Sequence, residues 1–567
     1  MIEQIKISIK EKLEAYYKEK YDLALAIVVE SPKKAEMGDI SIPMFTVVKA
    51  LRKPMPEIVN EAIEEIKSFD LPINSISNAG AFINLFVDKA KLSAKIIKDC
   101  VTLESEFGKS NLGEGKTVVL DYSSPNIAKS FSVGHLRSTM IGNSLKLILQ
   151  KCGYHTVAIN YLGDWGTQFG KMIVAIEKWG DIEVIKKDPI NELASLYVRV
   201  NNEEKDHPEI AEEAREAFRK IELGEPKYVE MWKWIREESL KESEQIYDLL
   251  GVSFDSYNGE AFYNDKMDPV VNELEEKGIL EEDQGAMVVR LSDDIPPALI
   301  KRSDGGTLYI TRDLAAVFYR KKEYNFEKAF YVVGGEQKLH FNQLKGVLTK
   351  MGYKDLADSI IHVNFGMVLK DGKKMSTRKG NVVKLYDILM QAIDAAYKQI
   401  EEKNPNMENK KEIAVKVGCG AVVFNDLKNF RALDYEFDIN AMVKFEGQTG
   451  PYLQYTGVRI AFILRDKEFD INNIDQNLFE KPHYFEIVKQ ISSFRMTVEK
   501  AVEEASPSVV AKYLLSLASS FNKFYSLEKI NAEDIVVRNT NFALAKSVRI
   551  VLNEGLRLLG INYLEEM

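Results

Sequence analysis

Hydrophobic and polar positions along the chain follow three different patterns, and each predicts a different kind of fold. Residues 1 to about 108 combine short strand-like segments with an amphipathic helical pattern, which predicts an α+β region. The apolar face of that helix is marked by Ile2, Ile5, Ile9, Leu13 and Tyr16. Residues 109–385 contain short apolar runs joined by helical patterns, as is typical of an α/β parallel sheet. Residues 386–567 carry almost only wide helical apolar stripes, which predict an all-helical region.

The middle region opens with a strand, a polar loop and a helix. The apolar run at 118–120 is short and rich in β-branched residues, and residues 123–126 are turn formers that end it. Apolar residues recur at helical spacing from Leu136 onward. In an open α/β sheet, ligands bind beyond the carboxyl ends of the strands, where helix N-termini present backbone donors to phosphates. The stretch 123–139 is therefore predicted to face a phosphate group.

A second strand and a glycine-rich stretch follow. The strand at 156–161 is reached through the helix, so residues 117–161 form one βαβ unit with a right-handed crossover. The stretch 163–170 then leads to a helix starting near Lys171, with one spacer residue too few for a Walker loop. This stretch is either a functional loop or a turn around a packed Trp165.

The second half of the sheet follows a charged helical segment. Residues 181 to about 260 are interpreted as an insertion between the two halves of the fold, with their charges on a solvated face. Apolar runs at 329–333 and 361–369 predict further strands, and the second leads into a basic loop at 370–380. A stretch with Gly and Pro at 445–455 is predicted to interrupt the C-terminal helices.

Composition limits the function only weakly. The 567 residues are 45% hydrophobic and 29% charged, as is ordinary for a globular chain. No apolar run approaches the ~18 residues of a membrane span, no signal peptide is evident, and the three cysteines are too far apart for a disulfide framework or zinc ribbon. We therefore expect a cytoplasmic protein without membrane association. The formal net charge of −10 leaves a nucleic-acid partner open, because binding depends on local basic patches.

Several sequence strings carry a resemblance to a known family. Residues 123–129 read Ser-Ser-Pro-Asn-Ile-Ala-Lys and residues 134–139 read Gly-His-Leu-Arg-Ser-Thr, which resembles the first signature of the arginyl-tRNA synthetases, a class I aminoacyl-tRNA synthetase family. Lys-Met-Ser at 374–376 resembles the second class I signature and follows the first, as the family requires. The strings at 163–170 and 82–84 also match the family pattern, so the resemblance covers nearly the whole chain.

The resemblance implies a domain organisation and a reaction. Residues 1–108 would be an N-terminal tRNA-contacting α+β domain, 109–385 a Rossmann-like catalytic domain with a helical insertion near 181–260, and 386–567 a helical anticodon-binding domain. The implied activity joins L-arginine to the 3′-terminal ribose of tRNA(Arg) through an adenylate formed from ATP, with release of pyrophosphate. ATP would act as a substrate with Mg²⁺, without a structural metal, and the protein would be a monomer.

The same resemblance implies the site residues, carried over position by position. The catalytic residues would be His135, Lys374, Lys129 and Ser132. The ATP-binding residues would be Gly134, His135, Lys374, Met375, Ser376, Arg378 and Lys379. The arginine-binding residues would be Ser124, Pro125, Asn126, His135, Tyr309, Asp313 and Gln337. The tRNA-binding residues would be Phe82, Asn84, Gln454, Tyr455 and Arg459.

Asp313 is the expected main specificity residue. A planar guanidinium requires a carboxylate in a defined geometry, and by family correspondence Tyr309 and Asp313 would hold that group. The alternative is that Asp313 is a helix N-terminal cap preceding Leu314.

One position departs from the family pattern, and another follows a degeneracy that many members of the family share. Ser132 stands where the family usually has His, and Thr377 occupies the final Lys position of the second signature, for which Lys129 is thought to compensate. Losing a preorganised hydrogen-bond donor costs roughly 3–4 kcal/mol of transition-state stabilisation. A Ser hydroxyl with a bridging water retains part of that stabilisation. We expect an active enzyme. The alternatives are a paralogue that binds tRNA or arginine without efficient aminoacylation, and a class I synthetase for another amino acid.

Overall fold

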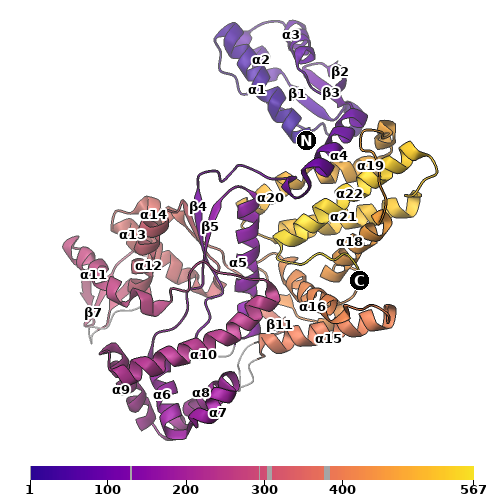
Figure 1. Ribbon diagram of the computed structural model, residues 1–567. Helices are drawn as coiled ribbons and strands as arrows, with labels where there is room; N and C mark the ends of the chain where they lie inside the picture. Colours follow the sequence, from indigo (N-terminus) through magenta and orange to yellow (C-terminus); the bar gives the residue numbers. More distant parts are fainter. Residues whose placement is uncertain (1, 128–130, 293, 303–308, 376–382) are drawn as a thin grey trace. The chain divides into compact units, whose positions relative to one another are not determined.

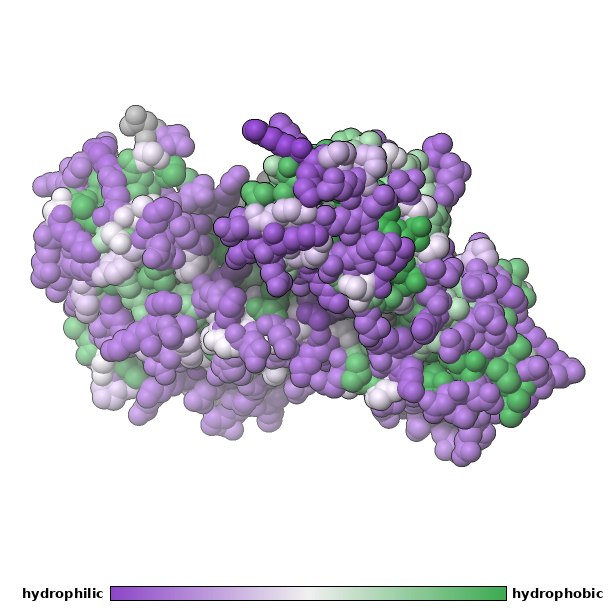
Figure 2. Space-filling model, turned by 90° about the horizontal axis from the view of Figure 1, so that it is seen from above, coloured by the Kyte–Doolittle hydropathy of each residue, from purple (hydrophilic) through white to green (hydrophobic). Residues whose placement is uncertain are grey.

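The computed structural model describes all residues except 1, 128–130, 293, 303–308 and 376–382, and the chain forms two compact units (Figure 1). The first unit contains Met1–Phe107, Arg459–Met496 and Ser516–Leu552, and the second contains Gly108–Val458, Thr497–Leu515 and Asn553–Met567. Figure 2 shows hydrophilic residues over most of the visible face, with hydrophobic residues in smaller patches between them. None of the helices in the described part of the chain is long and apolar enough to cross a membrane.

The N-terminal part of the first unit is an α+β fold around an antiparallel sheet. Its strands are β1 (Ile40–Pro43), β2 (Ile73–Ala79) and β3 (Phe82–Val87), in the order β1-β3-β2. Its helices are α1 (Ile2–Tyr21), α2 (Phe45–Leu51), α3 (Met55–Ser68) and α4 (Lys89–Leu103). Helix α1 buries Ile5, Ile9 and Leu13 as predicted. The buried aromatic residue is Tyr17 rather than Tyr16, because Tyr17 continues the row four residues beyond Leu13.

The C-terminal third of the chain is helical, as its apolar stripes predict. Its longer helices are α15 (Leu385–Lys403), α16 (Lys410–Leu427), α18 (Gly450–Leu464), α19 (Pro482–Ser492), α20 (Phe494–Glu503), α21 (Ser508–Leu527) and α22 (Ile535–Leu558). The predicted interruption at 445–455 is wrong in its second half, since α18 already begins at Gly450. Pro451 fits there because the first turn of a helix has no intrahelical bond for its missing N–H to make.

A four-stranded parallel sheet lies in the second unit. Its strands are β4 (Thr117–Asp121), β5 (His155–Ile159), β9 (Lys328–Tyr331) and β10 (Ile360–His362), in the order β10-β9-β4-β5. Val119 of β4 lies opposite Val157 on one side and Ala329 on the other, which confirms three of the predicted strands. Apolar residues of the sheet pack in one buried cluster with α11 (Met267–Glu276), α12 (Tyr309–Tyr324) and α13 (Lys338–Lys350). Parallel strands bring all four carboxyl ends to one edge.

A group of helices separates β5 from the second half of the sheet. They are α6 (Thr167–Trp179), α7 (Ile182–Lys187), α8 (Pro189–Asp206), α9 (Glu209–Glu222) and α10 (Pro226–Leu250). Helix α6 starts at Thr167, earlier than the predicted Lys171. The ring of Trp165 packs edge-on against Phe218 and Trp232, with centroids 5.3 and 5.6 Å away, so this stretch joins the insertion to the sheet.

Two features of the second unit were not predicted. A three-stranded antiparallel sheet of β6 (Glu281–Asp283), β7 (Ala286–Val289) and β8 (Ala298–Lys301) follows α11. The predicted strand at 361–369 is two strands, because β10 ends at His362 and β11 (Val368–Lys370) pairs instead with β12 (Lys373–Lys374) and β13 (Tyr435–Glu436). The chain passes so close to Leu433 at Gly366 that a Cβ there would lie 2.6 Å from the Leu433 carbonyl carbon.

Candidate active site

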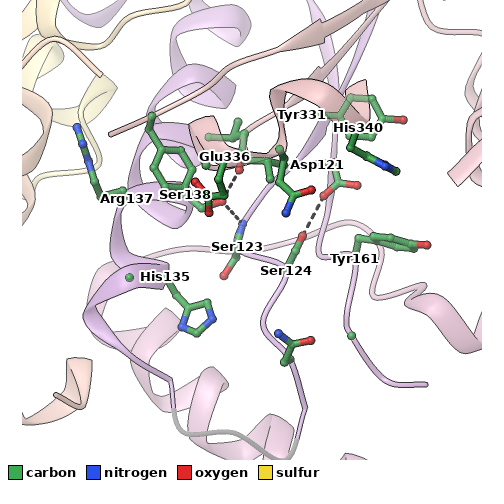
Figure 3. Close-up of a pocket in the computed structure, with 18 of the residues that line it drawn as sticks. Asp121, Ser123, Ser124, His135, Arg137, Ser138, Tyr161, Tyr331, Glu336 and His340 are labelled. Atoms are coloured by element: carbon green, nitrogen blue, oxygen red, sulfur yellow. Dashed lines mark hydrogen bonds between the residues drawn. The ribbon is translucent and has the colours of Figure 1, made fainter. Parts of the chain in front are cut away.

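A cavity of about 660 Å³ opens at the carboxyl ends of β4 and β9 (Figure 3). Its walls come from the turn after β4, the start of α5 (Val133–Lys151), α12, the turn after β9, and the segment around β11 and β12. The predicted site residues that line it are Ser124, Asn126, Ser132, Gly134, His135, Tyr309, Asp313, Gln337, Lys374 and Met375. The fold therefore gathers side chains from both halves of the sheet into one cavity.

The turn after β4 has a conformation that L-residues rarely adopt. Ser123 and Ser124 have φ angles of 69° and 46°, and each costs on the order of 1–2 kcal/mol. The N–H of Ser123 donates to the hydroxyl of Ser138 at 2.9 Å, and the N–H of Ser124 donates to the side-chain oxygen of Asn160 at 3.1 Å. Backbone strain held by such specific bonds is typical of functional sites.

A buried ion pair holds the hydroxyl of Ser124. Asp121 accepts from Arg320 at 2.8 Å through one oxygen and from the Ser124 hydroxyl at 2.9 Å through the other. Burial raises the pKa of Asp121, and the Arg320 charge opposes that rise. The guanidinium of Arg320 lies 5.1 and 5.6 Å from the ring centroids of Tyr161 and Tyr331, which adds cation–π attraction.

Asp313 is a carboxylate of the cavity that two side chains hold in place. It lies inside α12, which already includes Tyr309, so the alternative that Asp313 is an N-cap is wrong. Its Oδ2 accepts from Nε2 of His340 at 2.6 Å, and its Oδ1 accepts from the Tyr161 hydroxyl at 3.3 Å. Burial lowers the pKa of His340, but the hydrogen bond to Asp313 and its charge outweigh burial and raise that pKa above the ordinary value. The two bonds fix the plane of the carboxylate.

Another acidic side chain, Glu260, lines the same cavity. It is the first residue of the 3₁₀ helix η3 (Glu260–Lys266). Burial raises the pKa of Glu260 to about 7, against the charge of Arg312, whose Nη1 lies 3.3 Å away. Glu260 was not predicted, because it stands in a segment without a motif or a periodic pattern. Two neighbouring acids make this end of the cavity suited to a cationic ligand.

His135 is oriented by the backbone of Ser132. Nδ1 of His135 accepts the N–H of Ser132 at 3.0 Å, and the Ser132 hydroxyl lies 3.2 Å from the same nitrogen. Because Nδ1 is an acceptor here, the neutral ring carries its proton on Nε2. Ser132 is also the N-cap residue of α5. The shorter of the two contacts to Nδ1 therefore comes from a backbone group that every residue except Pro has.

Known proteins match this chain over most of its length. The model of the class I (R) tRNA synthetase catalytic domain matches residues 97–439, the arginyl-tRNA synthetase N-terminal domain matches 3–87, and the DALR anticodon binding domain matches 453–567. The chain belongs to the arginyl-tRNA synthetase family. Arginine–tRNA ligases of Latilactobacillus sakei and Streptococcus pneumoniae are 49% and 50% identical to it over 96% of both chains.

Solved structures of the family share the fold. The arginyl-tRNA synthetase of Thermus thermophilus has a TM-score of 0.80 at 24% identity, covering 99% of this chain and 100% of its own. The Plasmodium falciparum arginyl-tRNA synthetase has a TM-score of 0.78 at 23% identity, covering 99% of each chain. The class I catalytic domain, the N-terminal domain and the helical C-terminal domain predicted from the sequence are thereby confirmed.

The second signature of the family is described only in part. Lys374, in β12, and Met375 line the cavity. The other predicted residues here, Ser376, Arg378 and Lys379, lie outside the described residues, as do Thr377 and the upstream Lys129.

Three of the predicted site residues are buried within the fold, namely Pro125 and two of the predicted tRNA-binding residues. Pro125 is buried, does not line the cavity, and accepts the N–H of Gly163 at 3.1 Å through its carbonyl. Asn84 is 6% exposed and accepts the Ser41 hydroxyl at 2.9 Å. Gln454 is 1% exposed and donates to the carbonyl of Asn562 at 2.7 Å. The carbonyl of Pro125 and the side chains of Asn84 and Gln454 therefore bond within the fold.

The other predicted tRNA-binding residues are accessible. Phe82 is 37% exposed and packs edge-on against Phe45, with centroids 5.3 Å apart. Tyr455 is 40% exposed. Arg459 is partly exposed and donates to Asn522 at 2.8 Å.

Proposed function

We propose that this chain is an arginine–tRNA ligase, which activates L-arginine with ATP and transfers it to tRNA(Arg) for protein synthesis. The observation that carries the proposal is one cavity in which Asp313 and Glu260 lie with His135 and Lys374. The acidic pair suits a cationic amino acid, while the imidazole and ammonium suit a triphosphate. Membership of the family supports the same reaction.

The acidic end of the cavity selects arginine. Asp313 accepts the guanidinium through a carboxylate whose plane is set by His340 and Tyr161. Tyr309 and Glu260 line the cavity beside it. Lysine would place a point charge where a planar fork is required, and each acceptor left unpaired would cost roughly 1–3 kcal/mol.

The amino-acid end of arginine is held by the strained turn and the turn after β9. Ser124, Asn126 and Gln337 line the cavity there and supply acceptors for the ammonium group. Pro125 contributes indirectly, through the hydrogen bond between its carbonyl and Gly163. This arrangement leaves the carboxylate of arginine free to react.

ATP occupies the end of the cavity formed by α5 and β12. The carboxylate of arginine attacks the α-phosphate and pyrophosphate leaves, so negative charge develops on the phosphate oxygens. The Nε2–H of His135 and the ammonium of Lys374 stabilise that charge, and Gly134 lets the nucleotide approach the start of α5. Mg²⁺ enters with ATP as its counter-ion. Lys129, Met375, Ser376, Arg378 and Lys379 complete the binding of the nucleotide.

The remaining regions serve the tRNA. Residues 1–108 contact its body, and residues 386–567 bind its anticodon, with residues 109–385 as the catalytic domain. The accessible side chains Phe82, Tyr455 and Arg459 make these contacts, and Asn84 and Gln454 support them from within the fold. The protein acts as a monomer in the cytoplasm.

ATP–pyrophosphate exchange tests this proposal. Exchange should require arginine in the presence of tRNA, and Lys374→Ala should lower it strongly. Lys373→Ala is the matched control, because Lys373 is the neighbouring residue of β12 and does not line the cavity. Equal exchange with lysine, or an equal loss in the two variants, would contradict the proposal.

A further inference from the structure

A continuous series of buried side chains connects the two ends of the cavity. It runs through Asn160 of the segment after β5, Tyr247 of α10, Ser123 of the strained turn and Thr139 of α5. These four residues are 0%, 2%, 4% and 0% exposed. The amide of Asn160 donates to the Tyr247 hydroxyl at 3.0 Å, and the Tyr247 hydroxyl lies 2.7 Å from that of Ser123.

The far end of the series reaches the helix that carries His135. The Thr139 hydroxyl lies 2.9 Å from the Ser123 hydroxyl and 2.7 Å from the carbonyl oxygen of His135. At the near end, Asn160 accepts the N–H of Ser124 at 3.1 Å. Ser124 and His135 both line the cavity, and in the proposed function Ser124 binds arginine and His135 binds ATP.

The Thr139 hydroxyl joins the series to the start of α5. It is placed to donate both to the Ser123 hydroxyl and to the carbonyl oxygen of His135. A hydroxyl has one proton, so these two acceptors share it. At the other end Tyr247 accepts from Asn160, and either hydroxyl can be the donor between Tyr247 and Ser123.

Tyr247 is the one member of this series that comes from the helical insertion. Burial raises the pKa of Tyr247, so its hydroxyl keeps the proton that the series needs. Its ring is held independently by edge-on contacts with Phe131 and Phe254, with centroids 5.6 and 5.0 Å away. The hydroxyl can therefore be removed while the ring stays in place.

We propose that Tyr247 is a positioning residue, whose hydroxyl sets the strained Ser123–Ser124 turn relative to the start of α5. This inference rests on the proposed function, because it concerns how arginine and ATP are aligned for reaction. The φ angles of 69° and 46° in the turn need support from outside, and the Tyr247 hydroxyl supports both residues, Ser123 directly and Ser124 through Asn160. A misalignment at either end lowers the rate.

The first test is Tyr247→Phe, with Tyr122→Phe as the matched control. Tyr122 is a buried tyrosine that packs on the same Phe254, at 4.7 Å, and its hydroxyl lies 3.4 Å from the Ser253 carbonyl, outside the series. We expect Tyr247→Phe to lower kcat/KM by roughly ten- to a hundredfold and to raise the KM for arginine and the KM for ATP together. A loss of folded enzyme alone would lower kcat and leave both KM values unchanged, which would contradict the proposal.

The second test is a double-mutant cycle of Tyr247→Phe with Ser123→Ala. If both act through one series, the double variant loses little more activity than the more damaging single variant. If their effects multiply, the proposal is wrong.

Hydrogen exchange of the Ser123 and Ser124 amides gives a readout that does not depend on the reaction. It should be faster in Tyr247→Phe than in Tyr122→Phe. If the unmodified protein does not attach arginine to tRNA, the proposed function is wrong. If hydrogen exchange of these two amides is unchanged in Tyr247→Phe, this inference is wrong.

Discussion

Replacing Asp313 by Asn removes one negative charge while keeping the shape of the side chain. In the structure this carboxylate accepts from His340 at 2.6 Å and from Tyr161 at 3.3 Å. An amide keeps one acceptor oxygen but turns the other atom into a donor, which then faces either His340 or the incoming guanidinium. The substitution therefore tests whether the charge at this position selects the substrate.

The expected loss follows from the contacts at stake. A hydrogen bond to a charged group contributes roughly 1.5–3 kcal/mol, and the proposed guanidinium contact uses both oxygens of Asp313. We expect a total loss of about 2–4 kcal/mol, which corresponds to a fall in kcat/KM for arginine of about 30- to 1,000-fold. Citrulline, the neutral analogue, should compete better against arginine in the variant than in the unmodified protein.

The assay is aminoacylation at saturating ATP and tRNA with varied arginine, with citrulline as competitor. Asp265→Asn is the control, since Asp265 is an exposed acid of η3 that pairs with Lys266 at 2.6 Å and does not line the cavity. If the KM for arginine in Asp313→Asn stays within threefold of the unmodified value, or competition by citrulline is unchanged, the charge of Asp313 does not select the substrate.

Three further predictions concern the groups around this site. Protonated His340 competes with the guanidinium for Asp313, and its pKa is raised, so the KM for arginine should increase as the pH falls towards the ordinary imidazole value of about 6.5. His340→Gln should weaken that pH dependence. If the KM for arginine depends on pH equally in the variant and the unmodified protein, protonated His340 does not compete with the guanidinium. Arg320→Met leaves Asp121 buried without its ion-pair partner, so we expect the free energy of unfolding, measured in urea, to fall by about 3–5 kcal/mol. An unchanged midpoint of urea unfolding would show that the Arg320–Asp121 pair is not needed for stability. Ser132→Ala should change kcat less than threefold in aminoacylation, because the contact to His135 comes from a backbone N–H, and a large loss would assign the hydroxyl a direct role.

The site elements that the sequence predicts correctly depend on local patterns. The strand, the turn formers at 123–126 and the helix after them are neighbours in the chain, so the pocket edge that they form was predictable. The partners of Asp313 were not. His340 is 27 residues away and Tyr161 is 152 residues away, and they meet Asp313 only because α12 packs between α13 and the sheet.

Burial decides most of the differences between prediction and structure. Asn84 and Gln454 stand in strings typical of tRNA contact, yet both side chains bond inside the fold. The sequence of a motif does not show whether a polar side chain in it is exposed or buried. Glu260 shows the opposite case, because an isolated acid gives no signal until the fold places it beside Asp313.

The amino acid that this protein attaches to tRNA is measured by charging total tRNA with each of the twenty labelled amino acids, in the presence of ATP and Mg²⁺. The geometry of Asp313 and Glu260 predicts that arginine alone becomes attached to tRNA. Attachment of a different amino acid, or binding of tRNA without attachment of any, would contradict the account.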